Sequence, residues 1–210
     1  LYSGAFYKRF VEGKWVAAQG VVYPMFNEDI HVVNPPEAGF FTRFFISCDY
    51  GTVNPCSFGL WGEYEHKWYR IREYYFDSRK KGEQRTDAEH YEELEKLAGD
   101  LDIEAVIVDP SATSFIQCIR RKGRFTVIPA KNDVVDGIRQ VSDALKQRLI
   151  CFSPECRDTL REFSLYKWDD KAIRDAPRKE NDHAMDDIRY FVTTALNAPE
   201  NDFFVMSVSR

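Results

Sequence analysis

The chain has 210 residues, of which 44% are hydrophobic and 15% aromatic, enough for one well-packed domain with extensions or at most two small domains. Its formal net charge is −5, which excludes a uniformly basic nucleic-acid-binding protein, so contacts with nucleic acid must come from local patches or through metal ions. The five cysteines form no CxxC pair, which indicates free thiols and argues against structural zinc. No apolar run approaches the ~20 residues of a membrane span, and no signal peptide is recognisable.

Residues 1–40 show no clear hydrophobic period. They are rich in aromatic side chains and end in the breaker Asn34-Pro35-Pro36, which is typical of a boundary. We interpret them as an arm or linker, and the alternative is that they simply pack on the domain that follows. The first residue is Leu1 and not Met, which is consistent with a fragment of a longer chain.

From residue 42 onward the pattern predicts regular structure. Residues 42–49, 57–64 and 68–76 read as three strands joined by short turns, which indicates antiparallel hairpins. In the third strand, alternation places Tyr69, Ile71, Glu73 and Tyr75 on one face.

Helices and strands then alternate. Thr86 and Glu89 form a capping-box pattern that begins a helix, and Gly123 is suited to end a later one. The predicted elements after the first helix are a strand at 105–109, a helix at 111–122, a strand at 125–129, a helix at 133–148, a short strand at 149–152, a helix at 154–166, a loop or hairpin at 168–181, and a last helix at 183–197. Hairpins followed by this alternation predict an α/β fold with a mixed sheet flanked by helices.

Acidic residues stand where three of these elements begin or end. Asp49 ends the first strand, Asp109 ends the fourth, and Asp186 and Asp187 lie early in the last helix together with His183. If the two strands are parallel neighbours, their carboxylates lie side by side at one sheet edge. Clustered carboxylates need a cation, and hard oxygen ligands favour Mg²⁺ or Mn²⁺. Two such ions could clamp a phosphodiester for hydrolysis, with Asp49 in the bridging position.

The acid of the last helix is not fixed by spacing. At ~100° per residue, Asp186 and Asp187 flank His183 almost symmetrically on the polar side, and His183 could be a ligand or a proton carrier. Ordinary structural explanations exist for each acid, because Asp109-Pro110 can start a turn and acids at a helix start are common dipole partners.

Basic clusters could contact phosphates, although a solvated charged surface explains any single cluster as well. The clusters contain Arg79, Lys80, Lys81 and Arg85; Arg120, Arg121, Lys122 and Arg124; and Arg174, Arg178 and Lys179. Lys131 follows a strand end near the predicted acids and is a further candidate for phosphate contact. The chain has no P-loop, no GxSxG and no Gly-rich dinucleotide loop.

Three segments together resemble the C-terminal nuclease domain of the large terminase subunit of tailed bacteriophages. They are Ile46-Ser47-Cys48-Asp49-Tyr50-Gly51, Val106-Ile107-Val108-Asp109-Pro110-Ser111-Ala112 and Asp182-His183-Ala184-Met185-Asp186-Asp187-Ile188-Arg189-Tyr190. The resemblance spans roughly residues 42–197 and implies an RNase H-like fold. It also implies that residues 1–40 follow a packaging ATPase domain that is missing here, and that 41–210 form the nuclease domain.

The resemblance implies a metal-dependent DNA endonuclease that cuts concatemeric viral DNA during genome packaging. Carried over by motif, Asp49, Asp109 and Asp186 are metal ligands and catalytic residues, with His183 beside them, whereas Asp187 stands where many relatives carry a small residue. The implied cofactors are Mg²⁺ or Mn²⁺, as two ions. The implied partners are double-stranded DNA, a portal protein and a small terminase subunit, in the host cell cytoplasm and without a membrane.

Two alternatives remain open from the sequence. One is another nuclease of the same fold, such as a junction resolvase, which would prefer four-way junctions over linear duplex. The other is a non-catalytic docking module of a viral packaging machine, which would bind DNA or protein without metal-stimulated cleavage. The candidate DNA contacts are Lys131, Arg120, Arg121 and Lys122.

Overall fold

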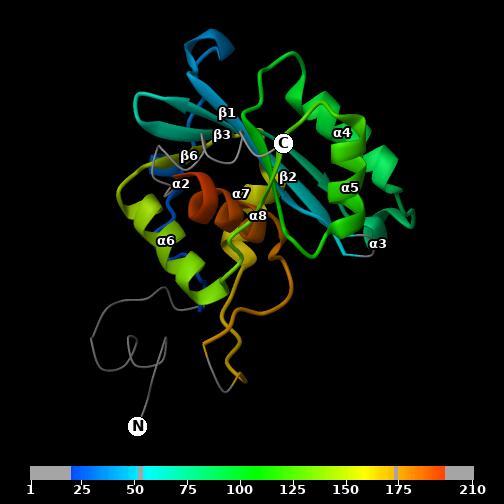
Figure 1. Cartoon of the computed structure of the whole chain (residues 1–210). Coiled ribbons are helices and arrows are strands. Elements are labelled where there is room, and N and C mark those ends of the chain that lie inside the picture. The colour runs from blue at the N-terminus through cyan, green and yellow to red at the C-terminus, as the bar shows by residue number, and fades with distance from the viewer. Residues whose placement is uncertain (1–19, 52–53, 173–174, 197–210) are drawn as a thin grey trace.

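The structure is a computed structural model that describes residues 20–51, 54–172 and 175–196. Within these ranges, a six-stranded sheet forms the centre in the order β5–β4–β1–β2–β3–β6, with helices on both faces (Figure 1). The strands are β1 (Arg43–Asp49), β2 (Cys56–Tyr64), β3 (Lys67–Phe76), β4 (Ala105–Val108), β5 (Val127–Pro129) and β6 (Ile150–Phe152). The predicted mixed sheet flanked by helices is confirmed.

The pairing of the strands brings two acids to one edge of the sheet. The β1–β2 and β2–β3 pairs are antiparallel, as their short connections predict. Strand β4 lies parallel to the other side of β1, and its register pairs Val108 with Cys48. Asp49 and Asp109 therefore follow the paired residues at the same end of two neighbouring strands.

The sheet separates two hydrophobic cores. Along β1, Phe44, Ile46 and Cys48 enter the core beneath α4 and α5, whereas Phe45 enters the core on the opposite face. The helices of the first face are α4 (Asp87–Ala98) and α5 (Thr113–Lys122), and those of the second are α6 (Val134–Lys146), α7 (Arg157–Leu165) and α8 (His183–Phe191). Because side chains alternate along a strand, Asp49 points to the same face as Phe45, toward α8.

Local capping chemistry explains where several helices begin and end. Thr86 and Glu89 form the predicted capping box of α4, and Gly123 ends α5 in the left-handed region with φ 75°. The last helix continues beyond α8 as a π-helical turn, η2 (Val192–Leu196), and the part of the prediction at residue 197 lies outside the described residues. Helix α7 begins at Arg157 and not at residue 154 as predicted. The short helices α2 (Glu28–His31), η1 (Ala38–Phe40) and α3 (Ser78–Lys81) were not predicted.

The predicted face of β3 is wrong because the strand contains a bulge. The register passes from Leu60–Arg72 to Trp61–Arg70, so Ile71 is an extra residue without a partner on β2. Tyr69 and Ile71 therefore contact the core of α4 and α5, whereas Tyr75 packs in the core of α8. A bulge shifts the two-residue alternation of a strand, which a simple period cannot anticipate.

The described part of the N-terminal segment packs against the domain. The Val22 N–H donates to the Tyr166 carbonyl at 2.9 Å, and the Val33 N–H donates to the Phe152 carbonyl at 3.0 Å. Residues 20–33 thus lie along α7 and β6. The division between an arm at 1–40 and a nuclease domain at 41–210 stays a prediction, and residues 1–19 lie outside the described part.

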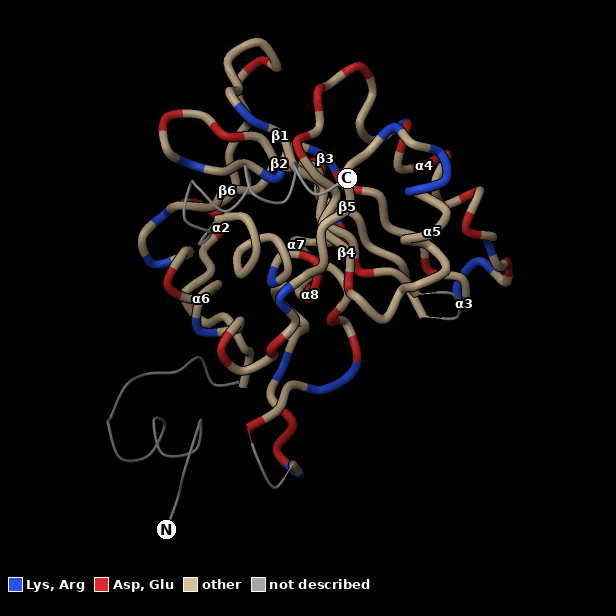
Figure 2. Tube along the Cα trace, viewed as in Figure 1, with Lys and Arg blue, Asp and Glu red and all other residues tan. Residues whose placement is uncertain are grey.

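Three bulk properties can be examined in the described structure: the state of the cysteines, the character of the helices and the distribution of charge. All five cysteines are free thiols. None of the helices in the described ranges has the length and apolar character that crossing a bilayer requires. Charges of both signs are distributed along the trace, as Figure 2 shows, which fits the modest net charge.

Candidate metal centre

Asp109, just after β4, is held by donors from three directions. Its Oδ1 accepts the Ser111 N–H at 2.8 Å, and its Oδ2 accepts the Tyr190 hydroxyl at 2.9 Å and the Asn132 amide at 3.3 Å. Although partial burial opposes ionisation, these hydrogen bonds hold the pKa of Asp109 below its ordinary value. Asp109 is therefore an oriented carboxylate and not merely the turn former that Asp109-Pro110 suggested.

Asp49, at the end of β1, contacts the first residue of α8. Its Oδ2 lies 2.8 Å from His183 Nδ1, and the Asp49 side chain is only 17% exposed. Burial raises the pKa of Asp49 to about 7, with Asp186 and Asp187 adding to the shift and His183 opposing it. The Asp49 hydrogen bond in turn raises the pKa of His183, against the effect of burial. Such a carboxylate is stabilised in its ionised form by a cation.

Asp186, in the first turn of α8, is fixed by an arginine one helical turn away. Arg189 Nη2 lies 2.9 Å from Asp186 Oδ1, and Arg189 Nη1 donates to the carbonyls of Asn132 and Asp133 at 2.8 and 3.2 Å. The other oxygen, Oδ2, lies 3.9 Å from the exposed Lys179 ammonium. Asp186 thus has one oxygen anchored in the protein and one facing the solvent side.

Helix α8 orients all three acids. His183 contacts Asp49, Tyr190 donates to Asp109, and Arg189 binds Asp186. Burial raises the pKa of the Tyr190 hydroxyl, and the negative charges of Asp49, Asp186 and Asp109 each add to this. Sequence reasoning included Arg189 and Tyr190 in the motif but assigned them no role.

Asp187 is part of the core and not of the polar side of α8, which corrects the helical-wheel expectation. It is fully buried and forms a two-pronged ion pair with Arg70 of β3. Its oxygens also accept the hydroxyls of Ser47, at 2.9 Å, and Ser57. A Cβ at Gly59 would overlap the Arg70 guanidinium, so this glycine makes room for the pair. No sequence signal indicates Arg70, because arginine is rarely fully buried.

A cavity of about 520 Å³ lies at the end of β1 and the start of α8, and Asp109 is not among the residues that line it. The cavity's charged lining consists of His183, five carboxylates and four basic residues: Asp49, Asp77, Glu180, Asp182 and Asp186, and Arg79, Lys80, Arg161 and Lys179. Arg79, Lys80 and Lys179 belong to two of the basic clusters of the sequence. A cavity with carboxylates on its wall and cations around them suits an anionic substrate that is bound through metal ions.

The basic residues predicted to contact DNA are not brought to this cavity. Arg120, Arg121 and Lys122 form the last turn of α5. The helix begins at Thr113, shortly after Asp109, so these residues lie roughly 10–15 Å along its axis from the end that is near that acid. Lys131 is nearer, because its N–H donates to the Thr194 hydroxyl at 3.0 Å in the loop that Arg189 holds. The side chain of Lys131 is exposed.

The donor set fits a divalent cation in chemistry. Three carboxylates and one imidazole are brought to one end of the sheet, and hard oxygen ligands are what Mg²⁺ and Mn²⁺ prefer. In the described part of the chain, no three such side chains already stand at the mutual distances of a complete metal site. Burial, and after it the charges of Asp186 and Asp187, raise the pKa of Asp49, and a bound cation would offset this effect.

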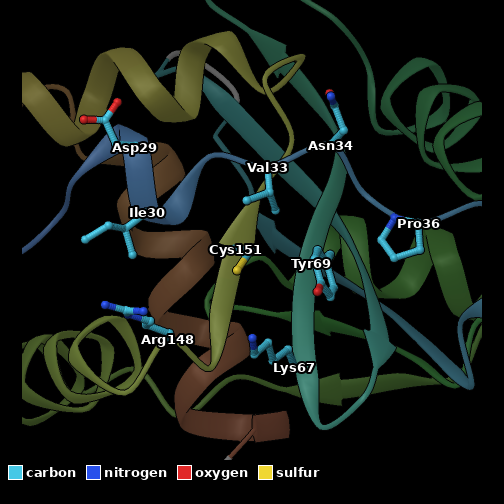
Figure 3. A pocket seen from close by; sticks show the side chains of 9 residues that line it. All are labelled: Asp29, Ile30, Val33, Asn34, Pro36, Lys67, Tyr69, Arg148 and Cys151. Atoms are coloured by element: carbon cyan, nitrogen blue, oxygen red, sulfur yellow. The ribbon is translucent and has the colours of Figure 1, made fainter.

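A second cavity, of about 390 Å³, lies at the opposite end of the sheet near the start of β3 and β6. Figure 3 shows Lys67, Tyr69, Arg148 and Cys151 on one side of it and residues of the segment from α2 to Pro36 on the other. This wall has one carboxylate, Asp29, and therefore no acid cluster. The predicted ligands Asp49, His183 and Asp186 line the first cavity instead.

Comparisons with known proteins agree with this geometry. No protein-family model matches the chain. The terminase large subunit of Escherichia phage T5 is 23% identical over 201 residues, which cover 90% of this chain and 45% of that protein. The structure of the large terminase from a thermophilic bacteriophage, in complex with ADP, matches with a TM-score of 0.83 and 48% identity, over 94% of this chain and 50% of that chain. The large terminase nuclease domain of bacteriophage SPP1, with bound Mn, matches with a TM-score of 0.55 and 20% identity, over 73% of this chain and 87% of that domain.

The six-stranded mixed sheet with helices on both faces has the predicted RNase H-like fold, which it shares with the SPP1 nuclease domain. The resemblance to the nuclease domain of the large terminase subunits of tailed bacteriophages is likewise confirmed. The chain spans about half the length of the T5 protein and of the thermophilic-phage terminase that it matches.

Proposed function

We propose that the chain is a divalent-metal-dependent DNA endonuclease domain that cuts concatemeric viral DNA during genome packaging. The observation that carries this proposal is that α8 contacts Asp49 and Asp109 and itself carries Asp186. Asp49 and Asp186 line a cavity whose basic residues, called the basic rim below, are Arg79, Lys80, Arg161 and Lys179. The similarity to a Mn-bound terminase nuclease domain supports a divalent metal, and the similarity to the T5 and thermophilic-phage terminases supports a packaging role. A portal protein and a small terminase subunit are the partners that such a role requires.

The proposed metal ligands are Asp49, Asp109, Asp186 and His183. Divalent ions, when bound, activate water and stabilise the negative charge of a phosphodiester under attack. The chain's own contribution is to orient the acids: Tyr190 and Asn132 fix Asp109, Arg189 fixes one oxygen of Asp186, and His183 holds Asp49. A site with prepositioned ligands avoids reorganisation when the substrate arrives.

The proposed DNA contacts are the four basic residues of the cavity, Arg79, Lys80, Arg161 and Lys179, with Lys131 nearby. Lys80 and Lys179 are 68% and 73% exposed, so both can reach phosphates that flank the cleaved bond. Nothing in this arrangement reads base edges, and we expect little sequence preference in the isolated chain.

Plasmid cleavage by the purified chain tests the proposal. Supercoiled DNA is incubated with EDTA, Mg²⁺ or Mn²⁺, beside the variants Asp109→Ala and Asp143→Asn, the latter an exposed control on α6. The proposal predicts nicking and linearisation that require metal, persist in Asp143→Asn and are lost in Asp109→Ala. Metal-independent cleavage, equal cleavage by Asp109→Ala, or no cleavage by the unmodified chain with either metal would contradict it.

A further inference from the structure

The N-terminus of α8 is not capped by its own preceding residue. Asp182 stands at the N-cap position, but its side chain makes no capping hydrogen bond. The first N–H groups of a helix have no partner within the helix, and in a buried helix they need an acceptor from elsewhere. Asp182 instead lines the cavity, with Oδ1 3.7 Å from His183 Nε2.

Glu162 of α7 supplies the missing acceptor. Its Oε2 accepts the Ala184 N–H at 2.7 Å, in the first turn of α8, and its Oε1 accepts the Tyr75 hydroxyl at 2.6 Å. Glu162 is completely buried. A buried carboxylate is costly unless its oxygens are hydrogen-bonded, and here both oxygens are.

We propose that Glu162 is a positioning residue for the metal centre. Glu162 holds the first turn of α8 so that His183 reaches Asp49. Ala184, which Glu162 binds, is the neighbour of His183, and His183 Nδ1 lies 2.8 Å from Asp49 Oδ2. By capping α8 from outside, Glu162 also leaves the Asp182 carboxylate facing the cavity. This inference rests on the proposed function, because it concerns the same site.

Glu73 offers a matched comparison within the same chain. The N-cap of α7, Cys156, likewise makes no side-chain cap, and Glu73 of β3 accepts the N–H groups of Asp158 and Thr159 at 2.7 and 3.1 Å. The Glu73 side chain is also almost buried, at 8% exposure. Glu73 and Glu162 each cap the N-terminus of a helix, but only α8, the helix that Glu162 caps, carries proposed metal ligands. Loss of a helix cap can therefore be separated from loss of the metal centre.

The experiment measures Mn²⁺ affinity by isothermal titration calorimetry for the unmodified chain, Glu162→Asp, Glu162→Gln and Glu73→Asp. Aspartate is one methylene too short to reach Ala184 and Tyr75 together, and we expect the affinity to fall by about tenfold, as for other residues that orient metal ligands. Glutamine keeps the length, accepts from Ala184 and donates to the Tyr75 oxygen, so it should retain most of the affinity. Glu73→Asp should lower stability in urea but leave Mn²⁺ binding nearly unchanged.

A second readout needs no metal. The amide resonance of Ala184 in the metal-free protein should shift in Glu162→Asp and remain close to its original position in Glu162→Gln. If Glu162→Asp does not fold, Tyr75→Phe removes only a hydroxyl from the same contact and should lower Mn²⁺ affinity in the same direction.

The inference would be overturned if the folded Glu162→Asp variant bound Mn²⁺ with unchanged affinity or, where that variant does not fold, if Tyr75→Phe did so. It would also be overturned if Glu73→Asp lost as much Mn²⁺ affinity as Glu162→Asp. A loss of Mn²⁺ affinity in Glu162→Gln as large as in Glu162→Asp would overturn it as well. An unmodified chain that binds no Mn²⁺ would overturn the proposed function itself. If the unmodified chain and every variant bound Mn²⁺ with equal affinity, only the role of Glu162 would be overturned.

Discussion

Each proposed carboxylate ligand is oriented by a different side chain of α8, and this is the most specific feature of the centre at the scale of single residues. His183, Tyr190 and Arg189 contact Asp49, Asp109 and Asp186 respectively. Mutation of a residue that orients a metal ligand typically lowers metal affinity by about 10- to 100-fold.

Tyr190→Phe tests this at Asp109. The change removes one hydroxyl and leaves the buried ring in the core, so the fold should persist. We expect Mn²⁺ affinity to fall by about tenfold, because Asp109 Oδ2 loses its shorter hydrogen bond. Calorimetric titration measures the change, with Tyr64→Phe at the end of β2 as control. Equal affinity in the two variants would show that Tyr190 does not position Asp109.

The metal-free protein should become less stable as the pH rises toward neutrality. Burial raises the pKa of Asp49 from 3.8 to about 7, so between these values the folded state binds more protons than the unfolded state, and stability falls as pH rises. The raised pKa of His183 acts in the same direction above its ordinary value of 6.5. The lowered pKa of Asp109 has its effect below 3.8, outside this window.

Urea unfolding in EDTA, followed across this pH range, measures the effect. Mn²⁺ should restore stability at neutral pH, because a bound cation favours the ionised carboxylate. Asp49→Asn should flatten the pH dependence in EDTA. The account of Asp49 would be wrong if the variant kept the full pH dependence.

The proposed ligands could be predicted from the sequence in part. The strand pattern placed Asp49 and Asp109 at strand ends, whereas the parallel pairing that brings these two ends side by side entered only as a condition and is seen in the structure. The choice between Asp186 and Asp187 did not follow, because the spacing was symmetric about His183. Arg70, distant in sequence and on another element, decides it by binding Asp187 in the core.

At the scale of elements, two arginines fix the rotation of α8. Arg70 of β3 binds Asp187. Arg189 of α8 itself donates to the Asn132 and Asp133 carbonyls and packs against Gly137 of α6. A Cβ at Gly137 would lie 2.6 Å from the Arg189 side chain, so α6 and α8 approach closely there. Such pairs specify one orientation of the helix more than they add net stability.

Asp187→Ala should lower the free energy of unfolding by about 3–5 kcal/mol, because it leaves the Arg70 charge buried without its partner. The double variant Arg70→Met/Asp187→Leu should recover much of this loss, since apolar groups replace both charges. Urea unfolding measures both. A loss below about 1 kcal/mol in Asp187→Ala, the range of ordinary surface changes, would contradict the structural role of the pair.

The elements themselves were largely predictable, and the exceptions have physical causes. Capping residues set the start of α4 and the end of α5 because they satisfy backbone groups locally. The bulge at Ile71 and the caps from Glu73 and Glu162 involve residues far apart in sequence, so no local pattern indicates them.

At the scale of the whole molecule, the mixed sheet sets the acids and the basic rim at one end and the second cavity, which Figure 3 shows, at the other. Composition and charge excluded a uniformly basic surface, and the structure agrees, because the cations that line the acidic cavity come from separate segments of the described chain. Which basic cluster lies near the site could not be read from the sequence, since it depends on how the loops return to the sheet edge.

DNA binding should therefore depend on the rim and not on the end of α5. The triple variant Arg79→Ala/Lys80→Ala/Lys179→Ala should weaken duplex binding and lower the slope of log affinity against log salt by up to about 0.9 for each phosphate interaction that the substitutions remove. Fluorescence anisotropy with a labelled duplex, in EDTA to prevent cleavage, measures both quantities. The matched triple Arg120→Ala/Arg121→Ala/Lys122→Ala should bind nearly as the unmodified chain does, and the reverse order of effects would contradict this assignment.

The most direct test of the central claim is anomalous diffraction from crystals of the chain grown with Mn²⁺. The account predicts one or two peaks at the ends of β1 and β4, with carboxylate oxygens of Asp49, Asp109 and Asp186 about 2 Å away and Asp187 still paired with Arg70. Peaks confined to other acids, or Mn²⁺ bound without these three carboxylates, would contradict it.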